Sequence, residues 1–350
     1  MNVKWACSVF LLLTFLLASS GCINQGNKPA GNGVVMENLE VDFPKVYAGE
    51  KFKLQAKIRN TGSVDAWYVI PKLYNIDASA SGQSFEITCS KDCTQCMNLL
   101  APDPERGTTG ESKICIWDCT APRSIPKGMT LTFNPSVRLY YAYRTTTTKA
   151  LMIASQDELR AIQNQGKALP SETVSTTTSP VQMDVVVNGP IRYWEGEKKL
   201  RFPININIAN TGGGTACGNF ESKPPSKKPS GSTSSEDSSP AAANPCPSQT
   251  GNVADTPQDT TAGIATGCEN PSNWNQVAIY FDNAISLEGC DDITQRGYVD
   301  LWKGQTKTIT CEVVMDVPDV KTGFVQKNLQ FTLEYDYFTD ASTNVEVIGR

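Results

Sequence analysis

The residues best able to do chemistry in this sequence are its cysteines, of which there are 12 among 350 residues. Cys93-x-x-Cys96 followed by Cys115-x-x-x-Cys119 has the spacing of a site in which four thiolates hold a zinc ion. In an oxidising compartment the same thiols pair into disulfides, each of which stabilises a domain by about 2–4 kcal/mol. The compartment therefore decides between a zinc site and disulfides.

Histidine is absent from the chain. Its absence excludes the Ser-His and Cys-His nucleophile pairs and the zinc sites that use imidazole ligands. The sequence also contains no Gly-x-Ser-x-Gly elbow and no phosphate-binding Gly-Lys-Ser loop. We therefore expect a protein that is not an enzyme and that uses no cofactor.

The N-terminal segment indicates the compartment. Lys4 precedes an apolar run over residues 5–17, which is shorter than the roughly 20 residues that a membrane-spanning helix needs. Small residues then lead to Cys22, as in a signal segment whose cysteine becomes the lipidated N-terminus. We expect residues 1–22 to be this signal, and the mature chain to be exported and anchored to the extracytoplasmic side of the cell membrane.

One position departs from the usual lipoprotein signal. Ser19 stands three residues before Cys22, where such signals usually carry Leu. Cleavage after Ser20 or Gly21 without lipidation is therefore the alternative. Either route exports the chain, and export favours disulfides over zinc for the remaining cysteines.

The charge of the chain is mildly acidic and evenly spread. Formal net charge is -5, from 31 basic and 36 acidic residues, and only 19% of residues are charged. A nucleic-acid partner would call for clustered Lys and Arg, so we expect none. The low charged and apolar fractions are typical of an extracellular β protein with long loops.

Five sequence landmarks occur twice in the same order. Each copy has a Gly-Glu-Lys turn, an alternating strand, an Asn-Thr-Gly turn, a strand after a tryptophan, and a Leu-x-Tyr-x-Tyr strand. A polar turn and a last apolar strand, residues 150–153 and 345–348, are expected to end each copy. The landmarks begin at Tyr47, Phe52, Asn60, Trp67 and Leu139 in the first copy, and at Trp194, Phe202, Asn210, Trp274 and Leu333 in the second.

The repeat predicts an all-β protein with two β-sandwiches in tandem. A capping-box pattern from Ser155 to Glu158 predicts one short helix between them. A Ser/Pro-rich stretch inside the second copy is expected to be a disordered insertion. The expected segments are a flexible tether at 23–34, sandwich one at 35–154, the helix and a Ser/Thr linker at 155–180, and sandwich two at 181–350 with the insertion at 221–271.

Residues 49–62 and 196–212 resemble the immunoglobulin-like domains of microbial surface proteins, of the cell-adhesion-related CARDB type. In that type a strand that ends in Asn-x-Gly precedes a loop and an aromatic-bearing strand. The resemblance implies two immunoglobulin-like sandwiches that serve as spacers, adhesion modules or partner-binding modules.

Comparison of the two copies suggests how the cysteines pair. The approaches to Cys89 and Cys290 are alike, and so are those to Cys115 and Cys311, so we expect the bridges Cys89–Cys115 and Cys290–Cys311. The other expected bridges are Cys93 or Cys96 with Cys119, and Cys217–Cys268 at the base of the insertion. One cysteine in each domain is left over, for example Cys96 and Cys246, to pair across domains, pair between chains or stay free.

An alternating aromatic strand is the remaining candidate site. Arg138, Tyr140, Tyr141 and Tyr143 could form a surface that stacks on a glycan or contacts a partner. The alternative is an ordinary strand with one face in the core and one in solvent, which we favour.

These observations predict a binding or scaffold module at the cell surface. Its contacts would be the membrane, through the lipid on Cys22, and a surface protein or glycan of unknown identity. The first alternative is a non-catalytic accessory subunit of an envelope transport or secretion complex. The second is a cysteine-rich metal-binding module, with Cys93, Cys96, Cys115 and Cys119 as its ligands.

Overall fold

The computed structural model describes most of the chain beyond the N-terminal segment. Described residues are 33–80, 82–90, 96–166, 173–194, 196–218, 268–282, 285–317 and 324–350. The predicted signal with Cys22, nearly all of the tether, Cys93, and most of the insertion with Cys246 lie outside these ranges. Among the described residues, no helix has the length and apolar character needed to cross a membrane.

The predicted all-β fold is confirmed: the described elements are nearly all strands. Two small antiparallel sheets each form one layer of a sandwich, and we call the sandwiches unit 1 and unit 2. The sheet of unit 1 has the order β1 (Val34–Val41), β3 (Lys51–Asn60), β9 (Ser112–Thr120), β7 (Thr88–Cys89). The sheet of unit 2 has the order β13 (Val181–Val187), β15 (Lys199–Asn210), β20 (Thr306–Asp316), β18 (Ser286–Glu288).

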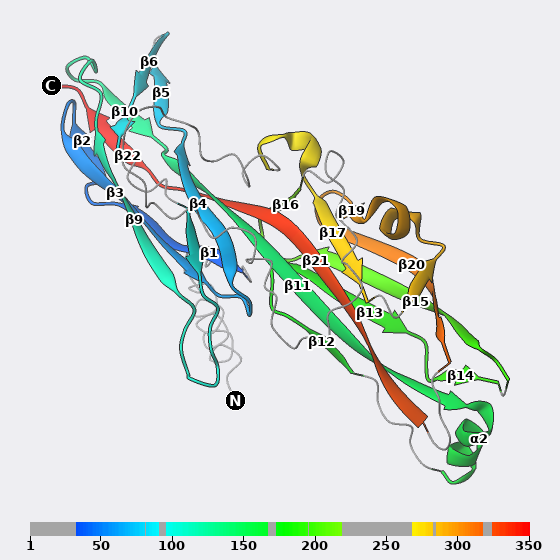
Figure 1. Cartoon of the computed structure of the whole chain (residues 1–350). Helices are drawn as coiled ribbons and strands as arrows, with labels where there is room; N and C mark the ends of the chain where they lie inside the picture. The colour runs from blue at the N-terminus through cyan, green and yellow to red at the C-terminus, as the bar shows by residue number, and fades with distance from the viewer. Residues whose placement is uncertain are drawn as a thin grey trace, which may run out of the picture.

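A single large sheet forms the second layer of both units and runs through the length of the molecule (Figure 1). Its main path is β19 (Tyr298–Asp300), β17 (Gln276–Phe281), β21 (Phe324–Ser342), β11 (Ser136–Ser155), β4 (Ala66–Tyr74) and β8 (Met97–Leu99). Three short strands join its sides: β12 (Val174–Thr176), β14 (Ile191–Tyr193) and β16 (Thr215–Cys217).

The remaining strands lie at the far end of unit 1 (Figure 1). One sheet has the order β10 (Thr130–Phe133), β22 (Val345–Ile348), β2 (Lys45–Tyr47), and a hairpin pairs β5 (Asp77–Ala80) with β6 (Gln83–Glu86). The last strand of the chain is therefore part of unit 1, although it belongs to the second sequence copy.

The two units exchange their last strands. The polar turn expected near residues 144–149 is wrong, because this Thr-rich stretch has no Gly, Pro or Asn and threonine favours strands. Strand β11 instead continues straight into unit 2, where its end pairs in parallel with β14. In the reciprocal exchange, β21 continues into unit 1, where β22 pairs in parallel with β2. The two sandwiches are thus interlocked rather than joined only by a linker.

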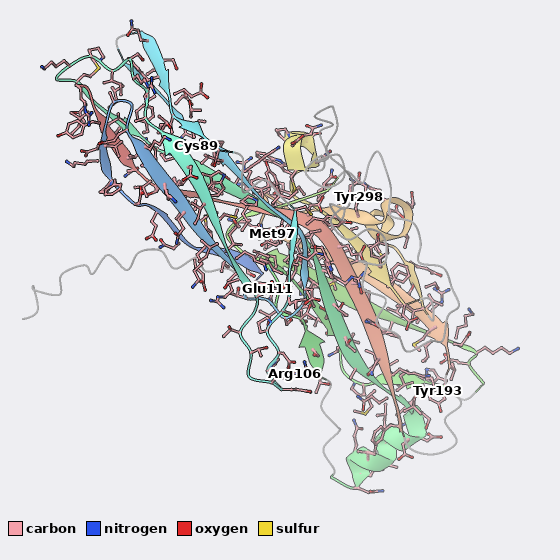
Figure 2. All side chains as sticks on the ribbon, turned by 60° about the vertical axis from the view of Figure 1, so that its left-hand side comes forward. Cys89, Met97, Arg106, Glu111, Tyr193 and Tyr298 are labelled. Atoms are coloured by element: carbon pink, nitrogen blue, oxygen red, sulfur yellow. A yellow bond between two sulfur atoms is a disulfide. The ribbon has the colours of Figure 1, made fainter. Side chains whose placement is uncertain are left out.

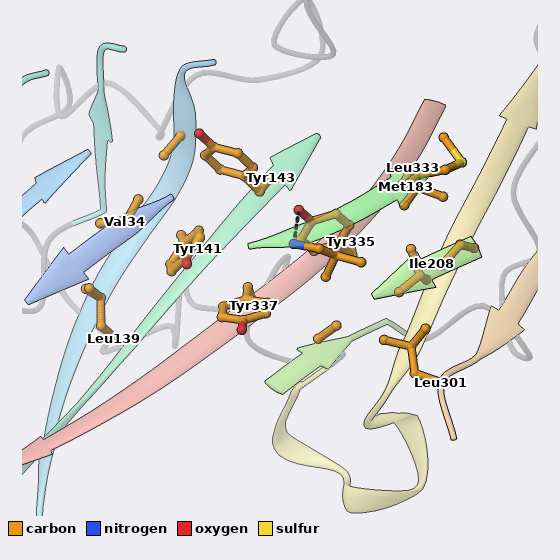
Figure 3. Packing of buried hydrophobic residues seen from close by; sticks show 14 of the residues in the cluster. Val34, Leu139, Tyr141, Tyr143, Met183, Ile208, Leu301, Leu333, Tyr335 and Tyr337 are labelled. Atoms are coloured by element: carbon orange, nitrogen blue, oxygen red, sulfur yellow. Dashed lines mark hydrogen bonds between the residues drawn. The ribbon is translucent and has the colours of Figure 1, made fainter. Parts of the chain in front are cut away.

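A pseudo-twofold axis relates the two copies at the centre of the shared sheet. The ladder pairs Tyr141 with Tyr337 and Tyr143 with Tyr335. Because the repeat makes Tyr141 equivalent to Tyr335 and Tyr143 equivalent to Tyr337, exchanging the copies converts one pair into the other. All four rings are buried on the face that meets the two small sheets, and the Tyr141 and Tyr337 ring centroids are 5.5 Å apart (Figure 3).

The two Asn-Thr-Gly motifs form turns, as predicted, and both turns contact these tyrosines. The Asn60 amide donates to the carbonyls of Val64 and Leu99, and the Asn210 amide donates to those of Gly214 and Gly304. The Tyr337 hydroxyl donates to Oδ1 of Asn210 at 2.7 Å, and Tyr143 lies in the same relation to Asn60. A side chain at Gly62 or Gly212 would collide with the tyrosine hydroxyl, so both turns require glycine.

Two inward-facing threonines explain how β11 tolerates polar residues in the core. The Thr145 hydroxyl donates to the carbonyl of Val181 at 2.6 Å, and the Thr147 hydroxyl donates to that of Met183 at 3.0 Å. Both carbonyls belong to β13, an edge strand whose backbone groups need partners from outside its own sheet. The two hydroxyls, which come from the facing sheet, therefore provide hydrogen-bond donors for carbonyls on the edge strand of unit 2.

The short helix expected after the first copy is present as α2 (Gln156–Asn164). The Ser155 hydroxyl accepts from the Glu158 backbone N–H at 3.2 Å, as the capping-box pattern predicts. The helix follows β11 directly and therefore lies at the far end of unit 2 (Figure 1).

The strand exchange predicts which unit each core truncation loosens. Ile153→Ala in β11 and Val347→Ala in β22 each remove a fully buried side chain and should cost about 2–4 kcal/mol. In native-state hydrogen exchange, Ile153→Ala should lower protection first in β14 of unit 2, and Val347→Ala should do so in β2 and β10 of unit 1. The opposite assignment would contradict the exchange.

Candidate interaction surface

Disulfides fix the loops of both units, and two of the expected bridges are confirmed: Cys217–Cys268 and Cys290–Cys311. Of the cysteines expected in unit 1, Cys89 pairs instead with Cys119. The expected Cys89–Cys115 bridge is wrong. Strand β7, which carries Cys89 (Figure 2), pairs only with the last residues of β9, where Cys119 stands directly opposite Cys89.

The remaining cysteines of unit 1 change accordingly. The expected bridge from Cys93 or Cys96 to Cys119 is also wrong, because Cys119 is bonded to Cys89. Cys96 and Cys115 are also disulfide-bonded, so Cys96 is not left over. The zinc alternative is wrong for the same reason, because a disulfide sulfur is not a thiolate and cannot ligate the metal as one. Among the described residues, no three His, Cys, Asp or Glu residues converge on a possible metal position.

Strand alternation divides the aromatic candidates between two faces of β11. Tyr141 and Tyr143 point into the core and are buried, which confirms the ordinary-strand interpretation for them. Arg138 and Tyr140 point to the opposite, outer face of the shared sheet. Tyr140 is only 6% exposed, so the four residues do not form the open aromatic surface given as one possibility.

The base of the insertion covers Tyr140. Tyr140 and Phe338 lie side by side on the outer face with ring centroids 5.9 Å apart, and Trp274 packs on Phe338 at 5.3 Å. The indole N–H of Trp274 donates to the Cys268 carbonyl at 2.8 Å. With the Cys217–Cys268 bridge these residues form a cluster separate from the main core. We call this cluster, Tyr140, Cys217, Cys268, Trp274 and Phe338, the root of the insertion.

Ion pairs border the root on the outer face. The Arg138 guanidinium donates to both Asp340 carboxylate oxygens, at 2.7 and 2.9 Å, and lies 4.3 Å from the Phe338 ring centroid. Lys72 pairs with Glu269 at 2.8 Å, which ties β4 of unit 1 to the residue that follows Cys268. The root and the ion pairs around it therefore contact strands of both units from outside the sheet.

Asp336 lies at the centre of this face. It stands on β21 between Ala142 of β11 and Cys217 of β16, at the position of the pseudo-twofold axis. Within the described ranges its half-buried side chain makes no hydrogen bond or ion pair, and desolvation by its surroundings raises the pKa of its carboxyl to about 7. The nearby Arg144 does not neutralise it, because that guanidinium pairs with Glu334 at 2.6 Å.

The amino-acid sequence did not identify Phe338, Trp274 and Asp336 as residues of one face. The predicted Cys217–Cys268 bridge located the base of the insertion, but nothing local shows which sheet face the base covers. The signal that could have found Phe338 is its alternation with Tyr337, which places it beside Tyr140 once β21 is known to pair with β11.

No family model matches the chain, and a search of curated proteins finds no match. The resemblance to CARDB-type domains therefore stays a prediction.

The outer face of the shared sheet combines apolar and charged groups. Around the root its described side chains are aromatic rings, ion pairs, a disulfide and the Asp336 carboxyl. Such a rigid, partly exposed face suits contact with another molecule or support of the insertion. The geometry therefore fits a binding or scaffold role.

Because the Asp336 carboxyl has no partner, we expect Asp336→Asn to raise the free energy of unfolding by an amount that depends on pH. A folded-state pKa of about 7, above the unfolded value of about 3.9, means that the wild type loses stability as pH rises from about 4 through 7. The variant should not lose this stability. Its free energy of unfolding should exceed that of the wild type by about 1–3 kcal/mol at pH 8 and should equal it near pH 4. Urea denaturation at the two pH values measures this.

Asp184→Asn, on the exposed side of β13, is the matched control and should give no such pH-dependent difference. A wild type that is more stable than Asp336→Asn at pH 8 would contradict the environment described for this carboxyl.

Proposed function

We propose that this protein is an exported scaffold, anchored through a lipid on Cys22 and acting as a non-enzymatic binding module for a surface protein or glycan. The observation that carries the proposal is the set of disulfides in a fold whose two units interlock. Disulfides persist in oxidising compartments, and they fit an exported protein. Interlocked units keep their mutual orientation, as a scaffold requires.

The position of the tether supports a particular arrangement at the membrane. The first described residue, Gly33, lies at the junction of the units, where its carbonyl accepts from Thr61 at 2.7 Å and its backbone lies against Pro180 and Tyr141. Eleven residue steps separate Cys22 from Gly33, which limits the tether to about 40 Å even when fully extended. An anchor at Cys22 would therefore hold the body by its middle rather than by one end.

This attachment distinguishes a scaffold from a stalk. A stalk that holds a partner away from the membrane is attached at one end, whereas attachment at the middle keeps both ends of the shared sheet near the surface. The insertion root lies on the face of the shared sheet opposite the Tyr141 side, to which Gly33 is joined. We therefore propose that the outer face is presented away from the tether.

Membrane attachment is tested by Cys22→Ser in the full chain. The variant should be exported but released into the soluble fraction, and mass spectrometry of the wild type should find a lipid on Cys22. Cys7→Ser is the matched control, because Cys7 leaves with the signal and its replacement should leave anchoring intact. An unmodified wild-type N-terminus at Gly21 or Cys22 would overturn the anchor.

A further inference from the structure

The internal repeat allows one face of unit 1 to be compared with the equivalent face of unit 2. Aligning Asn60 with Asn210 makes strands β3 and β9 equivalent to β15 and β20. In unit 1 the ladder pairs Lys57 with Ile114 and Gln55 with Ile116. In unit 2 the same positions pair Asn207 with Thr308 and Asn205 with Thr310. These four pairs occupy the sides of the small sheets that face away from the cores.

Unit 2 covers these positions with a polar ladder. The Thr308 hydroxyl donates to Oδ1 of Asn207 at 2.9 Å, and the Thr310 hydroxyl donates to Oδ1 of Asn205 at 2.7 Å. Unit 1 instead exposes two neighbouring isoleucines, 57% for Ile114 and 41% for Ile116. Since the same fold carries threonine at the equivalent positions, folding alone does not require isoleucine there.

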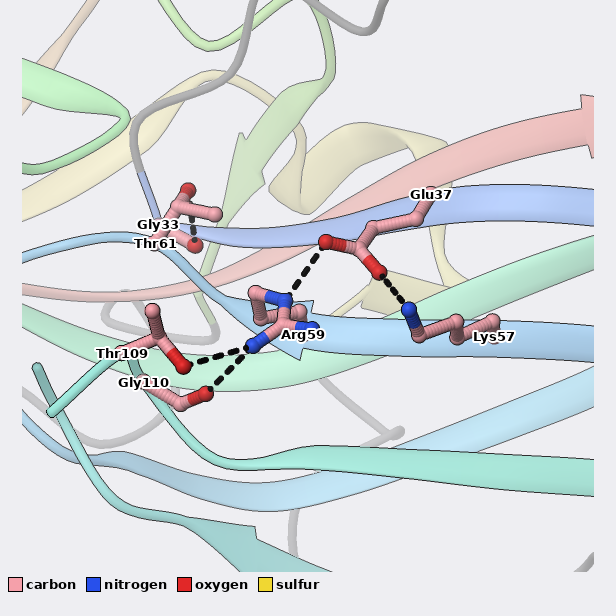
Figure 4. Close-up of polar contacts among 7 residues, drawn as sticks. All are labelled: Gly33, Glu37, Lys57, Arg59, Thr61, Thr109 and Gly110. Carbon is pink, nitrogen blue, oxygen red and sulfur yellow. Dashed lines mark hydrogen bonds and ion pairs between the residues drawn. The ribbon is translucent and has the colours of Figure 1, made fainter.

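The charges around the isoleucines are neutralised on the same face. The Glu37 carboxylate contacts both Lys57, at 2.8 Å, and Arg59 (Figure 4), and hydrogen bonds from these two groups lower its pKa. Lys53 pairs with Asp118 at 3.7 Å on the other side of the isoleucines. Lys51 and the second cation that shares Glu37 are balanced by two further exposed acids, Glu40 on β1 and Asp42 just beyond its end. The face therefore has an apolar centre and a charged border with no net charge.

We infer that this face, with Ile114 and Ile116 at its centre, is a contact surface for a second copy of the chain. A twofold arrangement places the isoleucine pair of one copy on that of the other. The compensated border removes the like-charge repulsion that self-association would otherwise meet, and it offers no excess of positive charge to an anionic lipid or nucleic acid.

The outward positions of β3 and β9 also favour a protein over a glycan. The described residues there are Lys51, Lys53, Gln55, Lys57 and Arg59 on β3, and Ser112, Ile114, Ile116, Asp118 and Thr120 on β9. None is aromatic, whereas a sugar ring is commonly held by stacking on an aromatic side chain.

The size of the face sets the strength of the contact. Three strands of about nine residues, at about 4.8 Å spacing and 3.4 Å rise, offer a flat area of about 450 Å². This lies at the low end for specific interfaces, so the dimer is weak and reversible. Self-association is one case of the proposed binding function and rests on that function, but it does not depend on a lipid at Cys22.

The test uses the exported Cys22→Ser chain, so that its outcome is separate from that of anchoring. Sedimentation equilibrium over a concentration series should show a monomer–dimer equilibrium. Replacing both isoleucines, Ile114→Thr with Ile116→Thr, gives unit 1 the residues of unit 2 and keeps β-branched side chains in the strand. The double variant should keep the wild-type melting curve and raise the dimer Kd at least tenfold.

Val186→Thr is the matched control, because Val186 is 39% exposed on β13, outside this face, and its replacement should leave the Kd unchanged. Amine cross-linking of mixed isotope-labelled and unlabelled chains should join Lys53 or Lys57 of one copy to the same region of the other. A wild type that stays monomeric up to about 1 mM, a dimer that the double variant preserves, or cross-links confined to other surfaces would each overturn the inference.

Discussion

The antiparallel ladder between β11 and β21 is the interaction on which the rest of the structure depends. It runs without a break from the Ser136–Ser342 pair to the Ala154–Phe324 pair, and so passes through both units. Each strand leaves the sheet of its own copy and completes that of the other, which converts two repeats into one body. Unfolding either unit therefore removes strand partners from its neighbour, and we expect the two to unfold cooperatively.

The two faces of the ladder have different physical roles. The inward face carries four buried tyrosines whose hydroxyls are satisfied by the Asn-Thr-Gly turns and by the first strand of each copy. The outward face carries the Tyr140–Phe338 pair beneath the Cys217–Cys268 bridge. Asp336 comes next along the ladder, and Arg144 follows it. Pseudo-symmetry holds closely on the inward face, because both cores need the same packing. It fails on the outward face, where only the second copy has an insertion to cover.

The departures from symmetry indicate where the protein does more than fold. Asp336 has Ala142 as its partner across the axis, and the isoleucines of unit 1 have threonines as equivalents in unit 2. Both differences lie on outward faces, where a substitution changes contact with solvent or with a partner rather than core packing. Together with the position of Gly33 at the junction of the units, they support the proposed scaffold, which would present two distinct surfaces.

The sequence by itself determined the features that depend on neighbouring residues. Alternation predicted β3 and β15, the Asn-Thr-Gly motif predicted its turns, and the capping box predicted α2, because each arises from local backbone and side-chain chemistry. The closure of the insertion by Cys217–Cys268 was also predictable, since the bridge joins the two ends of one loop. Export rests on the N-terminal segment and stays a prediction, with which the disulfides agree.

Only the tertiary structure decided which elements meet across the chain. The last strand of each copy could have folded back on its own unit, and the Thr-rich run 144–149 gave no sign that its hydroxyls would satisfy β13. Cys89 pairs with Cys119 because of the register between β7 and β9, which the spacing of cysteines does not encode. Tyr140 and Tyr141 are adjacent yet face opposite sides, and which side is covered depends on segments far away in sequence. Such outcomes depend on long-range pairing and burial, which no local pattern contains.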